Sequence, residues 1–383
     1  MPYRIPAVAV ALTLSLPAPA TWATQYAVTD LGALSSNGGT RGLAINASGQ
    51  VAGESYSTIG PPHAFGTVGS VIVPATDDKG TLGGSTSSGQ AINAAGQVAG
   101  YSLIDGSVTH AFRTAANAAI GPGDDLGTLG GPGSWAYAIN DSGQVAGYSR
   151  VSAANFDIRA FRTASGGSIT AATDLGTLGG SNSMAFGLNA SGQVVGGSSL
   201  AGNTTAHAFR TAPGGSITSA SDLGALPGAN WSRAVAINAS GGTVGWSYVS
   251  ASYYHAFYVP GDRALLPTDD LGTLGGSISG ARAINDAGVV VGVSTLAGDS
   301  VQHAFVWYGS GPLIDLNTLI PANSGWVLTD AYGINNAGQI TGSGTYNGNN
   351  AGFVLTIIPE PASLGLLSLG TLILLRRRPT VRS

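Results

Sequence analysis

Five histidines are the side chains with the widest chemistry in this 383-residue sequence, because an imidazole can bind a metal ion or transfer a proton. All five precede Ala-Phe, at His63, His110, His207, His255 and His303. Their spacing places each in a separate copy of a repeat, so the rings would lie on the order of 10 Å or more apart. Zinc ligation needs donor atoms about 2 Å from one ion. We therefore expect the histidines to have a structural role at the start of a strand.

An aspartate recurs with the same period. Copies of Asp-Leu-Gly-x-Leu, altered in the second and the last, begin at Asp30, Asp78, Asp125, Asp174, Asp222, Asp270 and Asp315. An Asp before a glycine corner commonly accepts hydrogen bonds from the amides of the turn, and we expect that role here. Calcium binding is the alternative, but it requires several acidic ligands in one loop, and no copy supplies them.

Catalytic patterns are missing from the sequence. Four acidic residues outside the repeated phrases, Asp105, Asp157, Asp299 and Asp330, could supply the paired carboxylates of a glycosidase, but none has an identifiable partner. The chain has no cysteine, which excludes disulfides, thiolate zinc sites and cysteine nucleophiles. No nucleophile elbow, phosphate loop or dinucleotide fingerprint occurs between a strand and a helix. We predict a protein that is no enzyme and needs no cofactor.

A unit of about 48 residues positions these groups. Its clearest phrase is Ile-Asn-Ala-x-Gly-Gln-Val-x-Gly, with the Asn at Asn46, Asn93, Asn140, Asn189, Asn238, Asn285 and Asn335. The composition, with 60 glycines and a single lysine, suits short strands and tight turns better than helices. The formal net charge is −4 and there is no basic stripe, which argues against nucleic acid as a partner.

Each unit can be read as four short strands. In the third copy, strands are expected at 136–139, 144–149, 159–163 and 168–175, with an Asn-x-x-Gly turn at 140–143. Seven such units predict an all-β protein, a seven-bladed β-propeller of four-stranded repeats, with a β-solenoid-like repeat array as the alternative. Residues 26–31 match a fourth strand and 353–355 a third. Pairing these two segments would close a ring and cover both edges.

Three tryptophans lie outside the repeated phrases. Trp135, Trp231 and Trp326 come 5, 7 and 9 residues before the repeated Asn of their copies, where we expect the connection between units. Exposed indoles on one rim could stack on sugar rings, since loops commonly carry binding residues. The alternative is that they fill gaps between neighbouring units.

The two ends have the features of targeting segments. Residues 1–23 combine a positive start, an apolar run and a small-residue cleavage site, as in a secretory signal peptide. Residues 358–383 contain Pro359, Glu360 and Pro361, an apolar stretch over 362–375, and Arg376, Arg377 and Arg378. A short apolar segment before arginines is a stop-transfer arrangement, which predicts transient membrane anchoring through the tail.

Two family resemblances fit these motifs. The seven units over 24–357, with His-Ala-Phe in five of them, resemble the HAF repeat of extracellular bacterial proteins; Arg159 and Ala351 replace the His in the other two. The tail resembles the PEP-CTERM sorting signal, which implies processing by an exosortase, as the leader implies signal peptidase. These resemblances imply a Gram-negative cell surface or extracellular matrix, in a setting of exopolysaccharide production.

Together these features predict an exported, non-catalytic surface or matrix protein. We expect it to bind or associate structurally with exopolysaccharide or other surface components. The alternative is a propeller hydrolase or lyase that acts on matrix glycans, which would need carboxylates clustered at one end of the channel.

Overall fold

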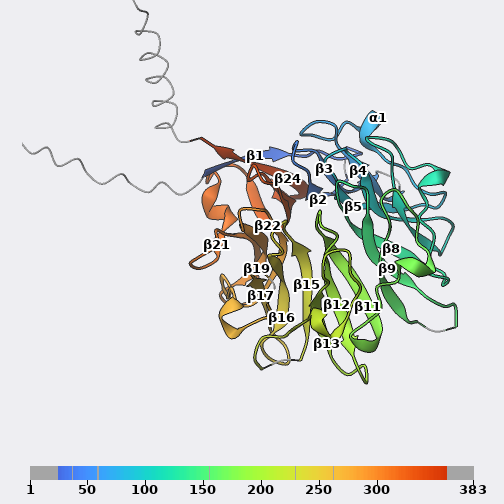
Figure 1. The fold of residues 1–383 in the computed structure, drawn as a ribbon. Coiled ribbons are helices and arrows are strands. Elements are labelled where there is room, and N and C mark those ends of the chain that lie inside the picture. The colour runs from blue at the N-terminus through green and yellow to red at the C-terminus, as the bar shows by residue number, and fades with distance from the viewer. Residues whose placement is uncertain are drawn as a thin grey trace, which may run out of the picture.

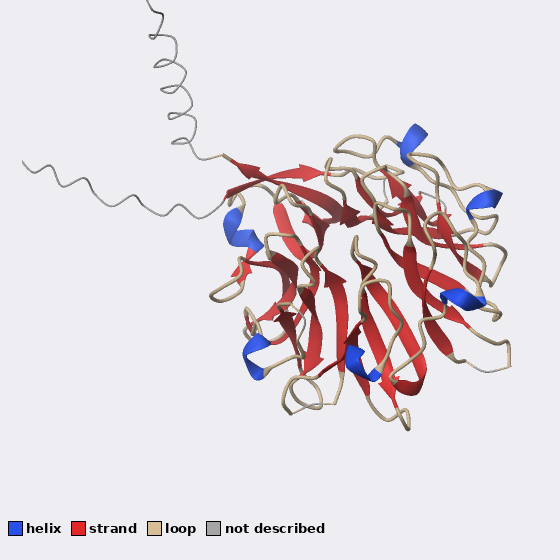
Figure 2. Cartoon of the chain, in the orientation of Figure 1, coloured by secondary structure: helices blue, strands red, loops and turns tan. Residues whose placement is uncertain are grey.

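The computed structural model describes residues 25–359, except 37, 58–59, 155, 229 and 262. These residues form an all-β structure of seven small antiparallel sheets (Figure 1). The short helical segments lie at the periphery of the sheets (Figure 2). Within the described part of the chain, no helix has the length and apolarity to cross a membrane. The predicted signal peptide over 1–23 and the sorting residues from Glu360 onward lie outside the described residues.

Each repeat unit supplies one sheet, numbered here from first to seventh in chain order. The first three sheets contain β2 (Thr40–Ile45), β3 (Val51–Ser57) and β4 (Gly60–Gly66); β5 (Ser87–Ile92), β6 (Val98–Leu103) and β7 (Thr109–Arg113); and β8 (Ser134–Ile139), β9 (Val145–Arg150) and β10 (Ile158–Arg162). The next two contain β11 (Gly179–Leu188), β12 (Val194–Leu200), β13 (Ala206–Arg210) and β14 (Asp222–Gly224); and β15 (Ser232–Ile237), β16 (Thr243–Tyr248) and β17 (Tyr254–Val259). The last two contain β18 (Gly275–Ile284), β19 (Val290–Leu296), β20 (Gln302–Trp307) and β21 (Ile314–Asp315); and β22 (Trp326–Ile334), β23 (Ile340–Tyr346), β24 (Asn349–Ile358) and β1 (Gln25–Asp30).

The turn between the first two strands of each sheet has the predicted chemistry. In the third sheet, Gly143 has φ 76° and its amide donates to the Asn140 carbonyl at 2.9 Å. The Asn140 Oδ1 accepts from the Gln144 amide at 3.0 Å. A glycine is required because L-residues with a Cβ rarely adopt this left-handed conformation. The predicted Asn-x-x-Gly turn is confirmed.

The same asparagines join each sheet to the next. The Asn46 Nδ2 donates to the Asn93 carbonyl at 3.0 Å, and equivalent bonds continue through every unit. The last bond runs from the Asn335 Nδ2 back to the Asn46 carbonyl at 3.0 Å, across 289 residues of sequence. The series of buried hydrogen bonds therefore returns to its first member. Because a buried amide without a partner is costly, each unit constrains the position of its neighbour.

The N-terminal strand β1 completes the seventh sheet. It pairs antiparallel with β24, from Gln25 opposite Ile358 to Asp30 opposite Phe353. The other units place their own Asp opposite the same Phe, for example Asp78 opposite Phe65. The predicted pairing of 26–31 with 353–355 is confirmed. The strands β1 and β24, far apart in the sequence, consequently lie side by side (Figure 1).

The expectation of four short strands in every unit is wrong for four of the seven sheets, which have three strands. Besides β1, a fourth strand forms only as the short β14 and β21; in the other described units it is a single bridge, such as Phe161 with Asp174. A helical turn precedes the repeated Asp in five units: α1 (Pro74–Asp77), η1 (Pro122–Asp124), η2 (Ala171–Thr173), η3 (Ser219–Ser221) and η4 (Pro267–Asp269). In the sixth sheet the helical turn, η5 (Leu316–Leu319), follows β21 instead. Pairing then ends because the Asp side chain accepts the amide hydrogen of the following turn.

The core lies between neighbouring sheets. Phe161 of β10 is fully buried and packs with Ala91 and Ala111 of the second sheet. Burying one such ring contributes about 2–3 kcal/mol. The glycine of Gln-Val-x-Gly is needed for close approach, since a Cβ on Gly147 would lie 1.9 Å from the Trp135 carbonyl oxygen. Small residues in the strands and one large ring per sheet thus allow the sheets to pack face to face.

Candidate binding site in the central cavity

The histidines pair with the repeated aspartates of their own units. The His Nδ1 lies between 2.6 and 3.1 Å from the carboxylate in all five pairs, which are His63–Asp78, His110–Asp125, His207–Asp222, His255–Asp270 and His303–Asp315. The predicted structural role is confirmed, because each ring holds the third strand to the segment that follows it. Among the described residues, no group of three or more acidic or His side chains could hold a metal ion.

The repeated Asp also makes the predicted turn contact. In all seven units its Oδ1 accepts a backbone amide two residues further on, at 2.8–2.9 Å. Burial acts to raise the pKa of Asp222 and Asp270, but the hydrogen bonds from the histidine and the turn amide outweigh it and the net pKa is lowered. These carboxylates are therefore structural anions.

The four candidate acidic residues do not form a catalytic pair. Asp105, Asp157, Asp299 and Asp330 belong to the second, third, sixth and seventh sheets. Asp105 accepts two amides of its own loop, and Asp299 accepts from Ser277 and Thr295. Asp330 is buried and pairs with Arg282 at 3.0 Å. Burial is the main cause that raises the pKa of Asp330, and Arg282 opposes it.

A bulge at one repeat position creates the main candidate site. In every sheet, the pairing of the first two strands shifts register three residues before the repeated Asn. The extra residue of such a bulge leaves the regular alternation of side chains. The seven residues at this position are Leu43, Gln90, Tyr137, Phe186, Val235, Arg282 and Tyr332. We call these seven side chains the cavity ring.

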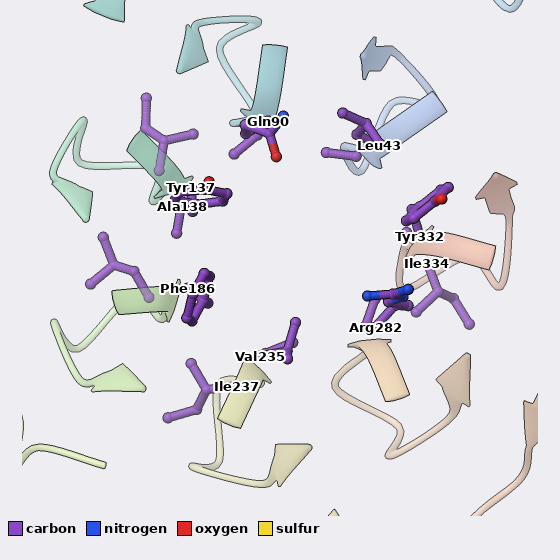
Figure 3. Close-up of a pocket in the computed structure, with 18 of the residues that line it drawn as sticks. Leu43, Gln90, Tyr137, Ala138, Phe186, Val235, Ile237, Arg282, Tyr332 and Ile334 are labelled. Carbon is purple, nitrogen blue, oxygen red and sulfur yellow. The ribbon is translucent and has the colours of Figure 1, made fainter. Parts of the chain in front are cut away.

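The cavity ring surrounds one cavity of about 430 Å³ (Figure 3). All seven side chains line it, each from a different sheet. Directly before and after the ring position, every unit has only Gly or Ala. Between these small residues, the side chain that faces the cavity differs from unit to unit. The scaffold stays constant while the lining differs around the ring.

Aromatic rings and one arginine form one side of the lining. Tyr137 packs against Phe186 and Tyr148, with ring centroids 5.1 and 5.5 Å apart. The Arg233 guanidinium lies 4.8 Å from the Phe186 centroid and 5.4 Å from that of Trp246. Burial lowers the pKa of Arg233. In the described part of the chain, no acidic side chain forms an ion pair with Arg233, and its guanidinium donates no hydrogen bond.

The predicted tryptophan rim needs a correction. Trp135 lies within β8 and stacks on Tyr148 at 5.1 Å, and Trp326 begins β22 and stacks on Tyr346 at 5.1 Å. Both indoles therefore belong to first strands and not to connections. Trp231 does precede its strand, and 41% of it is exposed. It lines a groove of about 480 Å³ that contains neither of the other two.

Sequence reasoning missed the cavity ring, Arg233 and Trp246. A signal was present: aligned copies of the unit show one variable position between two small ones. Nothing in that pattern indicates a bulge, because a regular strand would have turned the same side chain into the space between sheets.

Comparison with known proteins assigns no family to the chain. No protein-family model matches it, and no curated protein is similar to it. Its function has to be inferred from the cavity and the repeated residues.

Proposed function

We propose that the seven sheets are the blades of a closed β-propeller and that the protein is an exported, non-catalytic binding protein. The closure is supported by the return of the asparagine series from Asn335 to Asn46 and by the pairing of β1 with β24. A solenoid-like array would leave its terminal sheets without such partners. One strand supplied from the other end of the chain is a known way to close a propeller and cover its edges.

The cell surface or the extracellular polysaccharide matrix is the proposed location. The expected signal peptide over 1–23 and the sorting signal at Pro359, Glu360 and Pro361 support it, with signal peptidase and an exosortase as processing partners. Mass spectrometry of the protein from its native host tests this. A mature form that begins at Thr24 and lacks the tail is expected, whereas both termini intact in the cytoplasm would refute export.

The cavity ring is the observation that carries the binding role. The seven units share their turn and aspartate motifs but differ at the cavity-ring position, as expected for a common scaffold that presents a specific site. A volume of about 430 Å³ is within the range of small-ligand pockets, about 300–1,000 Å³. Aromatic faces such as Tyr137 and Phe186 suit the apolar faces of sugar rings. We infer that the ligand is a polysaccharide of the matrix.

The lining of the cavity supports binding without catalysis. Of the residues that the structure describes, neither Asp nor Glu lines it, whereas glycoside hydrolysis generally requires two carboxylates about 5–10 Å apart. The competing function, a hydrolase or lyase acting on matrix glycans, would release reducing ends or unsaturated sugars from the polymer.

Co-sedimentation of the purified protein with isolated exopolysaccharide tests the binding role. We expect the Tyr137→Ala/Phe186→Ala variant to bind about tenfold more weakly, because two stacking faces are lost. Tyr253→Ala is the matched control, since Tyr253 is exposed and does not line the cavity. Equal binding by the wild type, the double variant and the control would refute the cavity as the binding site. Release of soluble sugars would favour the enzyme.

A further inference from the structure

Trp246 connects two hollows of the molecule. It lines the central cavity together with Phe186 and Arg233, and it also lines the surface groove with Trp231 and Tyr248. The two hollows measure about 430 and 480 Å³. A ligand longer than one sugar could therefore contact Trp246 from both hollows.

Arg233 is the cation on this path, and it has no acidic partner in the part of the chain that the structure describes. Two other arginines near the first strands are neutralised: Arg282 pairs with Asp330 at 3.0 Å, and Arg41 with Glu54 at 3.3 Å. Around Arg233, the contacting groups are the faces of Phe186 and Trp246, with the phenols of Tyr137, Tyr148 and Tyr248 nearby. Among the described residues none accepts a hydrogen bond from this guanidinium, so its donors could bind an anion that enters the cavity.

The neighbouring sheet leaves room for this arginine. Gly197 lies eight residues after the repeated Asn of the fourth unit, and a Cβ there would contact the Arg233 Cγ at 3.7 Å. At this position the other units have Glu54, Tyr101, Tyr148, Trp246, Val293 and Ser343. A large side chain at Gly197 would occupy the space of the Arg233 stem. The glycine and the two rings together hold the guanidinium at the cavity wall.

We propose that Arg233, Trp246 and Trp231 form a binding track for an acidic oligosaccharide. One anionic sugar places its carboxylate or sulfate on the Arg233 guanidinium and its ring against the aromatic lining, and the next sugar lies on Trp231 in the groove. A planar guanidinium can bind two oxygens of such a group at once, with the strength of charge-assisted hydrogen bonds. This inference rests on the proposed polysaccharide-binding function and names the chemistry of its ligand.

Titration calorimetry with defined tetrasaccharides tests the track. The probes are tetragalacturonate, its fully methyl-esterified and therefore uncharged form, and a sulfated galactose tetrasaccharide. We expect at least one anionic probe to bind about tenfold or more tightly than the methyl ester. The stronger of the two anions identifies carboxylate or sulfate as the source. Equal binding of charged and uncharged probes would overturn the track and leave the polysaccharide-binding function standing, whereas no binding of any probe would overturn both.

Variants of Arg233 distinguish the effect of its charge on binding from an effect on folding. Arg233→Gln is expected to lose about tenfold or more in affinity for the anionic probe, and with it the salt dependence of binding. Arg41→Gln is the matched control, because Arg41 occupies the same repeat position but is paired with Glu54. The affinity of this variant for the anionic probe should equal that of the wild type. If Arg233→Gln folds poorly, Arg233→Lys keeps the charge without the planar fork and is expected to bind with intermediate affinity. Wild-type affinity in either Arg233 variant would overturn the role of the guanidinium.

Discussion

The first and fifth sheets contain the same arginine position with opposite surroundings. Arg41 and Arg233 both lie five residues before the repeated Asn and face the same point of the second strand. Opposite Arg41 is Glu54, which forms an ion pair with it at 3.3 Å, whereas opposite Arg233 is Trp246. One exchange between acidic and aromatic residues thus decides whether the cation is neutralised or available. The repeat fixes where the arginine lies, and its cross-strand partner decides what it can bind.

Two other repeated contacts are the same in both sheets. His63 contacts Asp78 in the first sheet as His255 contacts Asp270 in the fifth, and Phe65 and Phe257 are both fully buried. The difference at the arginine is therefore local. The comparison of the two sheets can be tested by substitutions in the core, at the residues opposite the two arginines and at the ionisable groups.

The largest expected effect is on the shared scaffold. Phe65→Ala and Phe257→Ala should each lower the free energy of unfolding by about 3–5 kcal/mol, because each leaves a cavity between two sheets. Phe65 packs against Leu31 and Val354, which belong to the two ends of the chain. Chemical denaturation of both variants measures the costs. A much smaller cost at Phe65 would show that the closure between the seventh and first sheets is weak.

The second prediction concerns the residue opposite Arg233. Trp246→Glu should give Arg233 the partner that Arg41 has, and we expect about a thirtyfold loss of affinity for the anionic tetrasaccharide, or about 2 kcal/mol. Calorimetry measures it. Trp246→Phe is the control, since it keeps an aromatic face without adding charge. Unchanged binding in Trp246→Glu would mean that the availability of Arg233 does not set the specificity.

A smaller effect concerns the pH dependence of stability in the fifth sheet. The net lowered pKa of Asp270 means that its carboxylate stabilises the fold above the unfolded pKa of about 3.9 and that this contribution is lost as the pH falls through the lower folded value. We expect the free energy of unfolding of His255→Ala to differ from that of the wild type by about 1 kcal/mol or less at pH 5. This difference should shrink below pH 3, and denaturation curves at the two pH values measure it. Affinity for the tetrasaccharide should be unchanged.

The smallest effect is at the paired arginine. Glu54→Gln removes an ion pair whose arginine side chain is 53% exposed, so the free energy of unfolding should change by less than about 1 kcal/mol. Thermal melting measures this change. Should Glu54→Gln raise the affinity for the anionic tetrasaccharide as strongly as Trp246→Glu lowers it, Arg41 would belong to the site as well.

Local sequence signals predicted much of the fold. The Asn-x-x-Gly turn, the aspartate turn and the pairing of 26–31 with 353–355 follow from the preferences of a few residues and from the phase of the repeat. The histidines were correctly expected to be structural for the same reason. Each of these features needs only contacts within one unit or the counting of units.

The site could not be read in the same way. The sequence placed Trp135 and Trp326 in connections, and they lie in strands. It gave no sign that the variable residue of each unit lies in a bulge, or that Arg233 has rings in place of a carboxylate beside it. It also suggested full fourth strands where a helical turn and a single bridge form.

The repeated unit, its turns and its all-β character follow from the sequence alone, because they depend on backbone preferences within a few residues. Which side chains meet across units depends instead on how the sheets pack. Phe186 and Arg233 are 47 residues apart in the chain and belong to neighbouring sheets. Their contact depends on how two sheets pack, on the space that Gly197 leaves and on the bulge that turns Phe186 inward, and none of these is encoded in a local preference.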